Sequence, residues 1–114
     1  MKQRFRLRSS KAIQHIRQAG KSYASPLVVL MVLPNQEQIT RCAIIASRSV
    51  GGAVQRNRCR RLLRAAMTLF VNDLDTGYEV VLIARQRLLS APFEQIKSSL
   101  EKLLMESKLL NGSK

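Results

Sequence analysis

Runs and alternations of apolar residues predict several short strands. The uninterrupted apolar run at 27–33 has the length of a buried strand, and a second strand-like run follows at 39–46. The sequence between these runs, Pro-Asn-Gln-Glu-Gln, is typical of a polar turn, so we expect the two strands to pair as an antiparallel hairpin. The segment YEVVLIA at 78–84 predicts a further strand, and 47–52 has room for a brief one.

Helical spacing of apolar residues predicts three helices. The first extends from a capping serine, Ser9 or Ser10, to just before Gly20, and the others cover 53–71 and 91–110. On the second helix the apolar side chains gather on one half of the cylinder. They are Val54, Cys59, Leu62, Leu63, Ala66, Met67, Leu69 and Phe70. The order αβββαβα predicts an α+β fold, a two-layer sandwich of three helices on a small mixed sheet.

Length and composition indicate one folded domain, residues 1–114, with 105–114 expected to fray at the end. The 46% hydrophobic content is too high for a disordered basic tail. No apolar run approaches the roughly 20 residues that a bilayer requires. The basic N-terminus is not followed by the apolar region of a signal peptide, so we expect a cytoplasmic protein.

Cysteine and histidine are scarce, which bears on metal binding. The two cysteines, Cys42 and Cys59, do not form a CxxC pair, and His15 is the one histidine. A zinc site needs about four clustered nitrogen or sulfur ligands, so we expect no metal site in the protein. We expect two free, buried thiols, and a polar surface position for His15.

Positive charge is concentrated in the first two thirds of the chain. Residues 1–72 hold 14 Lys and Arg against one acid, Glu37, whereas 73–114 hold six of each sign. The net charge of +13 therefore lies entirely in 1–72. Such a surface repels itself unless a polyanion neutralises it, and nucleic acid is the first candidate. An anionic membrane is the alternative, but 4% aromatics and no Trp argue against an inserting amphipathic helix.

The predicted second helix and the segment before it contain the candidate binding residues. These are Arg48, Arg56, Asn57, Arg58, Arg60, Arg61 and Arg64. Arginine binds phosphate through two parallel hydrogen bonds and stacks on unpaired bases, which lysine does not do. The glycine pair before the helix leaves its start open to a phosphate. The alternative is a surface helix whose charges are paired elsewhere, but seven acids cannot pair 20 cations.

Catalysis by the protein's own side chains is not supported. Two-metal nucleases need several converging carboxylates, and the basic part of the chain has only Glu37. His15 has no acidic residue within ten positions to orient it, and no Ser-His-Asp set is suggested by spacing. An independent nuclease is therefore disfavoured.

The run Gly-Gly-Ala-Val-Gln-Arg-Asn-Arg-Cys-Arg-Arg-Leu-Leu-Arg at 51–64 resembles the RNR signature of the protein subunit of bacterial ribonuclease P. Residues 7–20 resemble the first helix of that family, and YEVVLIAR at 78–85 resembles its last strand. The resemblance extends over nearly the whole chain, from about residue 4 to residue 104.

The resemblance implies a left-handed βαβ crossover and a subunit of an endoribonuclease. In that family the RNA subunit, with bound Mg²⁺, hydrolyses one phosphodiester of precursor tRNA, and the protein contributes no catalytic group. The protein contacts the RNA subunit and the 5′ leader; no DNA partner is expected. The family's RNA-contacting positions are matched by Arg56, Asn57, Arg58, Arg60, Arg61 and Arg64. Ile13, Arg17 and Met31 match a leader cleft between the first helix and the sheet.

Two departures from the family pattern affect these expectations. Gly52 stands where the family often has Asn, and the cleft positions lack the aromatics that the family often has there. We therefore expect weaker base stacking, with the guanidinium of Arg17 as a substitute platform. A structural RNA-binding protein of the ribosome remains the alternative, because the same charge would serve it. The RNA that copurifies would distinguish the two.

Overall fold

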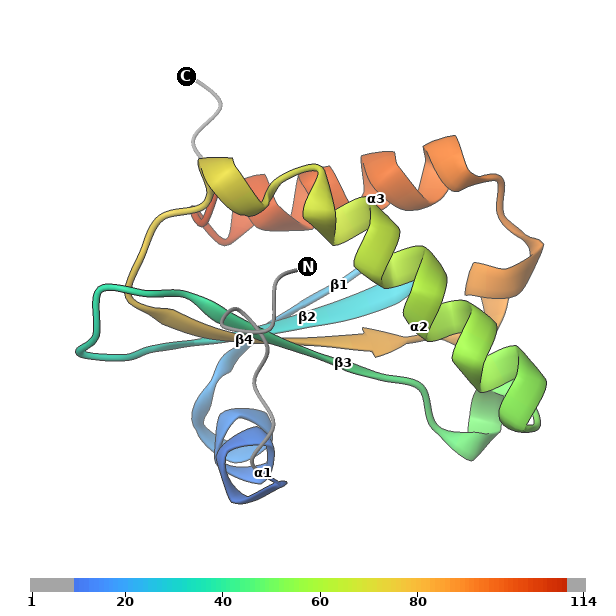
Figure 1. Cartoon of the computed structure of the whole chain (residues 1–114), viewed down its shortest axis with the longest axis horizontal. Coiled ribbons are helices and arrows are strands. Elements are labelled where there is room, and N and C mark those ends of the chain that lie inside the picture. Colours follow the sequence, from blue (N-terminus) through green and yellow to red (C-terminus); the bar gives the residue numbers. More distant parts are fainter. Residues whose placement is uncertain (1–9, 111–114) are drawn as a thin grey trace.

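The computed structural model describes residues 10–110. Four strands form one sheet in the order β1-β2-β4-β3. The strands are β1 (Lys21–Ala24), β2 (Val28–Pro34), β3 (Arg41–Ile45) and β4 (Tyr78–Ala84). The helices are α1 (Ser10–Ala19), α2 (Ala53–Thr68) and α3 (Phe93–Glu106), and short 3₁₀ turns lie at Arg48–Val50, Val71–Asp73 and Gln86–Ser90. Helices α2 and α3 cover one face of the sheet and α1 lies against the other (Figure 1). The α+β prediction is confirmed.

The predicted hairpin is wrong, because β4 lies between β2 and β3. Strand β2 pairs antiparallel with β4, and β3 pairs parallel with it. The polar turn crosses the start of β4: the Asn35 N–H donates to the Gly77 carbonyl at 2.7 Å, and Asn35 Nδ2 donates to Glu79 Oε2 at 2.9 Å. Val80, Val81 and Leu82 are all buried, so this apolar strand needs a neighbour on each edge. The burial of β4, a strand distant in the sequence, decides which strands pair, and the short loop between β2 and β3 does not.

The brief strand predicted at 47–52 is also wrong, because that segment forms the 3₁₀ turn at Arg48–Val50. The remaining strand is β1, which pairs antiparallel with β2. Only Tyr23 of its KSYA sequence packs on the core, so an apolar pattern could not identify this edge strand. The turn from β1 to β2 is held by Ser25, whose hydroxyl accepts from the Leu27 and Val28 N–H groups at 3.2 Å. The predicted order αβββαβα is kept.

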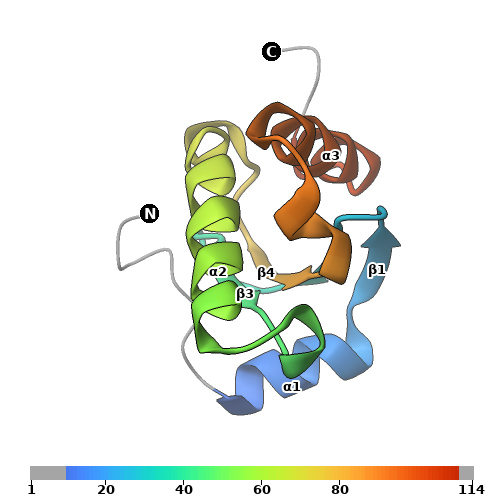
Figure 2. The ribbon, with the colours of Figure 1, turned by 90° about the vertical axis from the view of Figure 1, so that its right-hand side faces the viewer.

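Helix α2 connects the parallel neighbours β3 and β4 over one face of the sheet (Figures 1 and 2). Viewed from the carboxyl ends of these strands, as in Figure 2, the path from β3 through α2 to β4 is left-handed. Most βαβ connections are right-handed. The structure thus has the exceptional crossover that the family resemblance implied.

The core lies mainly between the sheet and the α2–α3 pair, and a smaller cluster of Ile16, Ala43 and Val81 lies under α1. Both cysteines are free and buried, as predicted, and burial raises the pKa of the Cys42 thiol to about 12. Leu109 is fully buried and its carbonyl accepts from the Asp75 N–H at 2.9 Å. The expected fraying therefore does not apply to residues 105–110, and 111–114 lie outside the described residues.

Helix α2 ends earlier than predicted, at Thr68, and two residues assigned to its apolar half are exposed. Val54 is 76% exposed and Leu69, just after the helix, is 52% exposed. Nine positions separate Val54 from the buried Leu63, and at about 100° per residue this places them on opposite sides of the helix. Val54 therefore lies on the outer side of α2, and its apolar character alone misplaced it.

Candidate nucleic-acid interface

Helix α2 begins without a side-chain cap, as the glycine pair predicted. Gly51 has φ of 133°, a conformation that side chains rarely adopt, and a Cβ there would lie 2.9 Å from Gln55 Cβ. Gly52 occupies the N-cap, and its carbonyl accepts the first helical bond from the Arg56 N–H at 2.9 Å. With no side-chain acceptor, the first N–H groups of the helix are left for solvent or an anion.

The outer side of α2 presents the predicted arginines. Arg58 and Arg61 are exposed, and Arg56, Arg60 and Arg64 are half-buried. An open hollow on this side is lined by Val54, Asn57, Arg60, Arg61 and Arg64. Arg60 Nη2 donates to Asn57 Oδ1 at 2.6 Å. The Nε atoms of Arg56 and Arg64 are buried without a hydrogen-bond partner. We call these residues together the arginine face: Arg56, Arg58, Arg60, Arg61 and Arg64, with Asn57 and Val54.

Carboxylates do not neutralise the arginine face within residues 10–110. The ion pairs found in that range join Arg41 to Glu37 at 2.6 Å and to Glu79 at 3.4 Å. Hydrogen bonding from Arg41 lowers the pKa of Glu37 below its ordinary value. The alternative of a surface helix with internally paired charges therefore finds no support in the described part of the chain.

Arginines that sequence reasoning missed lie at the same end of the sheet as Arg48. Because β3 and β4 are parallel, their carboxyl ends meet, and the 3₁₀ turns that follow them contact each other. Arg48 is exposed in the first turn, and Arg85 and Arg87 are exposed at the second. Arg85 Nη1 donates to the Ser25 carbonyl at 3.2 Å. Parallel pairing was the missing information, because the predicted hairpin did not bring these segments together.

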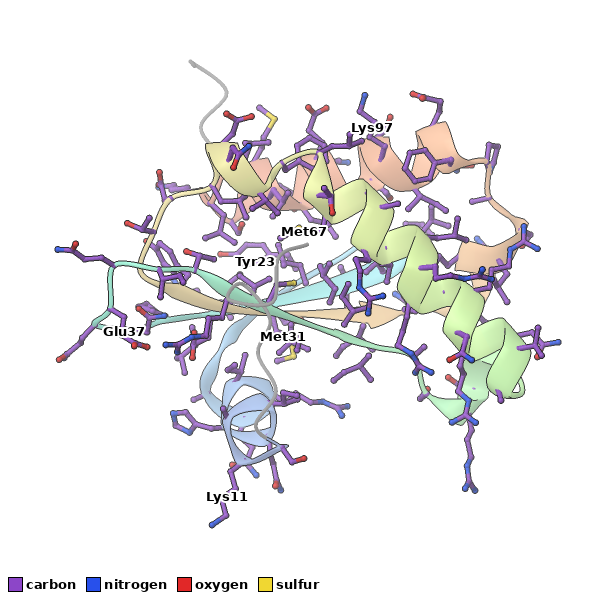
Figure 3. All side chains as sticks on the ribbon, in the orientation of Figure 1. Lys11, Tyr23, Met31, Glu37, Met67 and Lys97 are labelled. Carbon is purple, nitrogen blue, oxygen red and sulfur yellow. The ribbon has the colours of Figure 1, made fainter. Side chains whose placement is uncertain are left out.

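The three predicted cleft residues lie on the α1 side of the sheet. Ile13 and Met31 are half-buried and pack on the cluster under α1, and Figure 3 shows Met31 between the sheet and the helix. Arg17 is exposed in the last turn of α1, four positions after Ile13 and so on the same side of that helix. His15 lies on α1, where it is exposed.

Apolar side chains extend this surface along the same face of the sheet. Val29 of β2 is aligned with Ile83 of β4, which is aligned with Ile45 of β3, and all three are half-buried. Strand alternation places them on the same face as Met31. The face is thus aliphatic where the family often has aromatics. Arg17 lies near this face, in the last turn of α1.

Two further features, a cluster of metal ligands and a membrane-spanning helix, are absent from residues 10–110. No group of three or more His, Cys, Asp and Glu side chains is close enough to hold a metal ion. Within the same residues, none of the helices has the length and apolar character needed to span a membrane.

Comparison with known proteins gives consistent relatives. A family model described as Ribonuclease P matches residues 1–108. The ribonuclease P protein component of Chloroflexus aurantiacus is 39% identical over 111 residues, which are 96% of this chain and 82% of that protein. The ribonuclease P protein of Staphylococcus aureus superposes with a TM-score of 0.84 at 28% identity, covering 94% of this chain and 98% of that one. That of Thermotoga maritima gives 0.79 at 25% identity, with 89% and 96% covered. These matches do not support the ribosomal alternative, and the chain belongs to the ribonuclease P protein family.

Proposed function

We propose that this chain is the protein component of a cytoplasmic ribonuclease P ribonucleoprotein, which removes the 5′ leader of precursor tRNA by phosphodiester hydrolysis. The catalytic centre is assigned to the RNA subunit, and the protein acts by binding. Family membership and the unneutralised arginine face support this assignment.

The arginine face is assigned to the RNA subunit. Its guanidinium groups project from one rigid helix, which suits the recognition of a folded ribose-phosphate surface. Each phosphate contact releases counterions, so affinity rises as salt falls. The uncapped start of α2 provides a further place for a phosphate oxygen.

The α1 side of the sheet is assigned to the 5′ leader, with Ile13, Arg17 and Met31 as contacts. A single strand can lay its bases on the aliphatic surface while its phosphates lie near Arg17. Arg48, Arg85 and Arg87, at the carboxyl ends of β3 and β4, would extend the positive surface at that end of the sheet. Binding both RNAs raises the affinity for substrate.

Magnesium is assigned to the RNA and not to the protein. Arg41 pairs with both Glu37 and Glu79, so these carboxylates already have a cationic partner. When bound to the RNA, Mg²⁺ would supply a metal-activated water and charge stabilisation for hydrolysis. By neutralising phosphate repulsion between leader and RNA subunit, the protein would lower the Mg²⁺ concentration that cleavage requires.

The test compares cleavage of precursor tRNA by the purified chain, by the RNA subunit, and by both together over a range of Mg²⁺ concentrations. We expect no cleavage by the chain alone and faster cleavage by the mixture, with the largest gain at low Mg²⁺. Efficient cleavage by the RNA-free chain would contradict the division of labour. An unchanged rate in the mixture would contradict the role as a subunit.

A further inference from the structure

Val54 is the apolar member of the arginine face. It lies in the first turn of α2, its side chain is 76% exposed, and it lines the same hollow as Asn57, Arg60, Arg61 and Arg64. Isolated exposed apolar side chains are common on proteins and need no explanation. Val54 differs because its neighbours in the hollow are three guanidinium groups and an amide, so a ligand held by them must also cover the isopropyl group.

The hydrogen bond inside the hollow fixes the orientation of the Asn57 amide. A guanidinium has no acceptor, so the Asn57 atom 2.6 Å from Arg60 Nη2 must be the carbonyl oxygen. The amide nitrogen is therefore directed away from Arg60 and presents two N–H donors. The Nε of Arg64 is buried and lacks an acceptor, so this side chain has an unmet hydrogen-bonding requirement.

We propose that this hollow binds one unpaired nucleotide of an RNA, with its base packed on Val54. Asn57 Nδ2 donates to an acceptor on that nucleotide, and Arg61 and Arg64 contact its phosphate. A phosphate alone would gain nothing from the isopropyl group. A paired nucleotide has both base faces covered by stacking, so only an unpaired one presents an apolar face. The inference rests on the proposed RNA-binding function and adds a nucleotide-level contact to it.

The experiment measures binding of the full chain to two probes over a range of salt concentrations. One probe is a short single-stranded oligoadenylate, and the other is a blunt RNA duplex with the same number of phosphates. Every chain, including the parent, carries Arg17→Ala, which weakens the second single-strand surface proposed on the α1 side of the sheet. The variants are Val54→Ala and Val54→Ile, with Leu69→Ala as matched control, because Leu69 is also exposed but lies at the other end of α2. Alanine has the higher helix propensity, so Val54→Ala is not expected to weaken the fold, and thermal unfolding verifies this.

We expect Val54→Ala to bind oligoadenylate about tenfold more weakly, the effect of losing two buried methyl groups. The slope of log affinity against log salt is expected to stay at the value of the parent chain, because no charge is removed. Val54→Ile and Leu69→Ala are expected to bind as the parent chain does, and duplex binding is expected not to change in any variant.

Three results would overturn the proposal: equal binding by Val54→Ala and Leu69→Ala, an equal loss on duplex and single strand, or a changed salt slope for Val54→Ala. Failure of the proposed function would look different, because the chain would then not accelerate cleavage of precursor tRNA by the RNA subunit, whatever its affinity for these probes.

Discussion

The molecule uses arginine in two contrasting settings. Arg41, at the start of β3, is paired with Glu37 and Glu79 and fastens the β2–β3 crossing to β4. The arginines of α2 are held by no carboxylate in the described residues, and Arg60 donates to the Asn57 amide instead. Both settings contain arginine, so the difference between them is whether a carboxylate lies near the guanidinium group. Arg41 is paired within the fold, whereas the arginine face has no carboxylate partner within residues 10–110 and is proposed to bind an external anion.

The two sides of α2 extend this comparison to one helix and predict the largest effect. Leu63 is fully buried on the inner side, so Leu63→Ala is expected to cost about 2–5 kcal/mol of unfolding free energy through lost burial and a cavity. Urea unfolding measures the loss. Wherever the variant is folded, its RNA salt slope is expected to match wild type. A Leu63→Ala variant as stable as wild type would contradict the assigned inner side.

Replacing one arginine by alanine in each setting, Arg64 on α2 and Arg41 on β3, tests the comparison directly. Arg64→Ala is expected to lower the slope of log affinity against log salt by about 0.7–0.9, as one phosphate contact is lost. Arg41→Ala is expected to leave that slope unchanged and to lower the urea midpoint instead. Titrations of the RNA subunit at several salt concentrations, with parallel urea curves, measure both. Equal slopes for Arg64→Ala and wild type would remove Arg64 from the interface.

The smallest expected effect concerns pH. Arg41 lowers the pKa of Glu37 in the folded chain, so the pair stabilises the fold at pH values above the ordinary Glu pKa. This contribution is lost as the pH falls through the lowered pKa. Glu37→Gln is therefore expected to reduce the difference in thermal stability between neutral and acidic solution, with no change in RNA binding. A pH profile of Glu37→Gln that superimposes on wild type would show that the pair does not stabilise the fold.

Local patterns predicted the three helices and the strands β2, β3 and β4, but not the edge strand β1. Strand β4 occupies the predicted residues, and the arginines of α2 lie on the outer side that helical periodicity gave them. In both cases the pattern of a single element contains the information, because each has a fully apolar run or one apolar side. The family and its crossover came from the motif at 51–64, not from periodicity.

Relations between elements could not be predicted from local patterns. The pairing of β2 with β4, and not with β3, depends on where an apolar strand far along the chain finds two neighbours. The same error concealed Arg85 and Arg87, whose position beside Arg48 requires parallel strands. Val54 was misplaced for a local reason. Its residue type indicated the core, but its angular position on α2 is opposite to the buried Leu63, and its side chain is exposed.

The central position of β4 has a consequence for the order in which the chain becomes stable during synthesis. Until residue 84 has emerged from the ribosome, β2 and β3 have no strand between them, and the left-handed connection through α2 has no anchor. The early part of the chain, with all of the excess positive charge, is therefore made before the sheet can close. A nascent chain stalled before this strand is expected to stay unfolded and sensitive to protease. Closure of the sheet late in translation is the step that converts a basic polypeptide into a rigid protein.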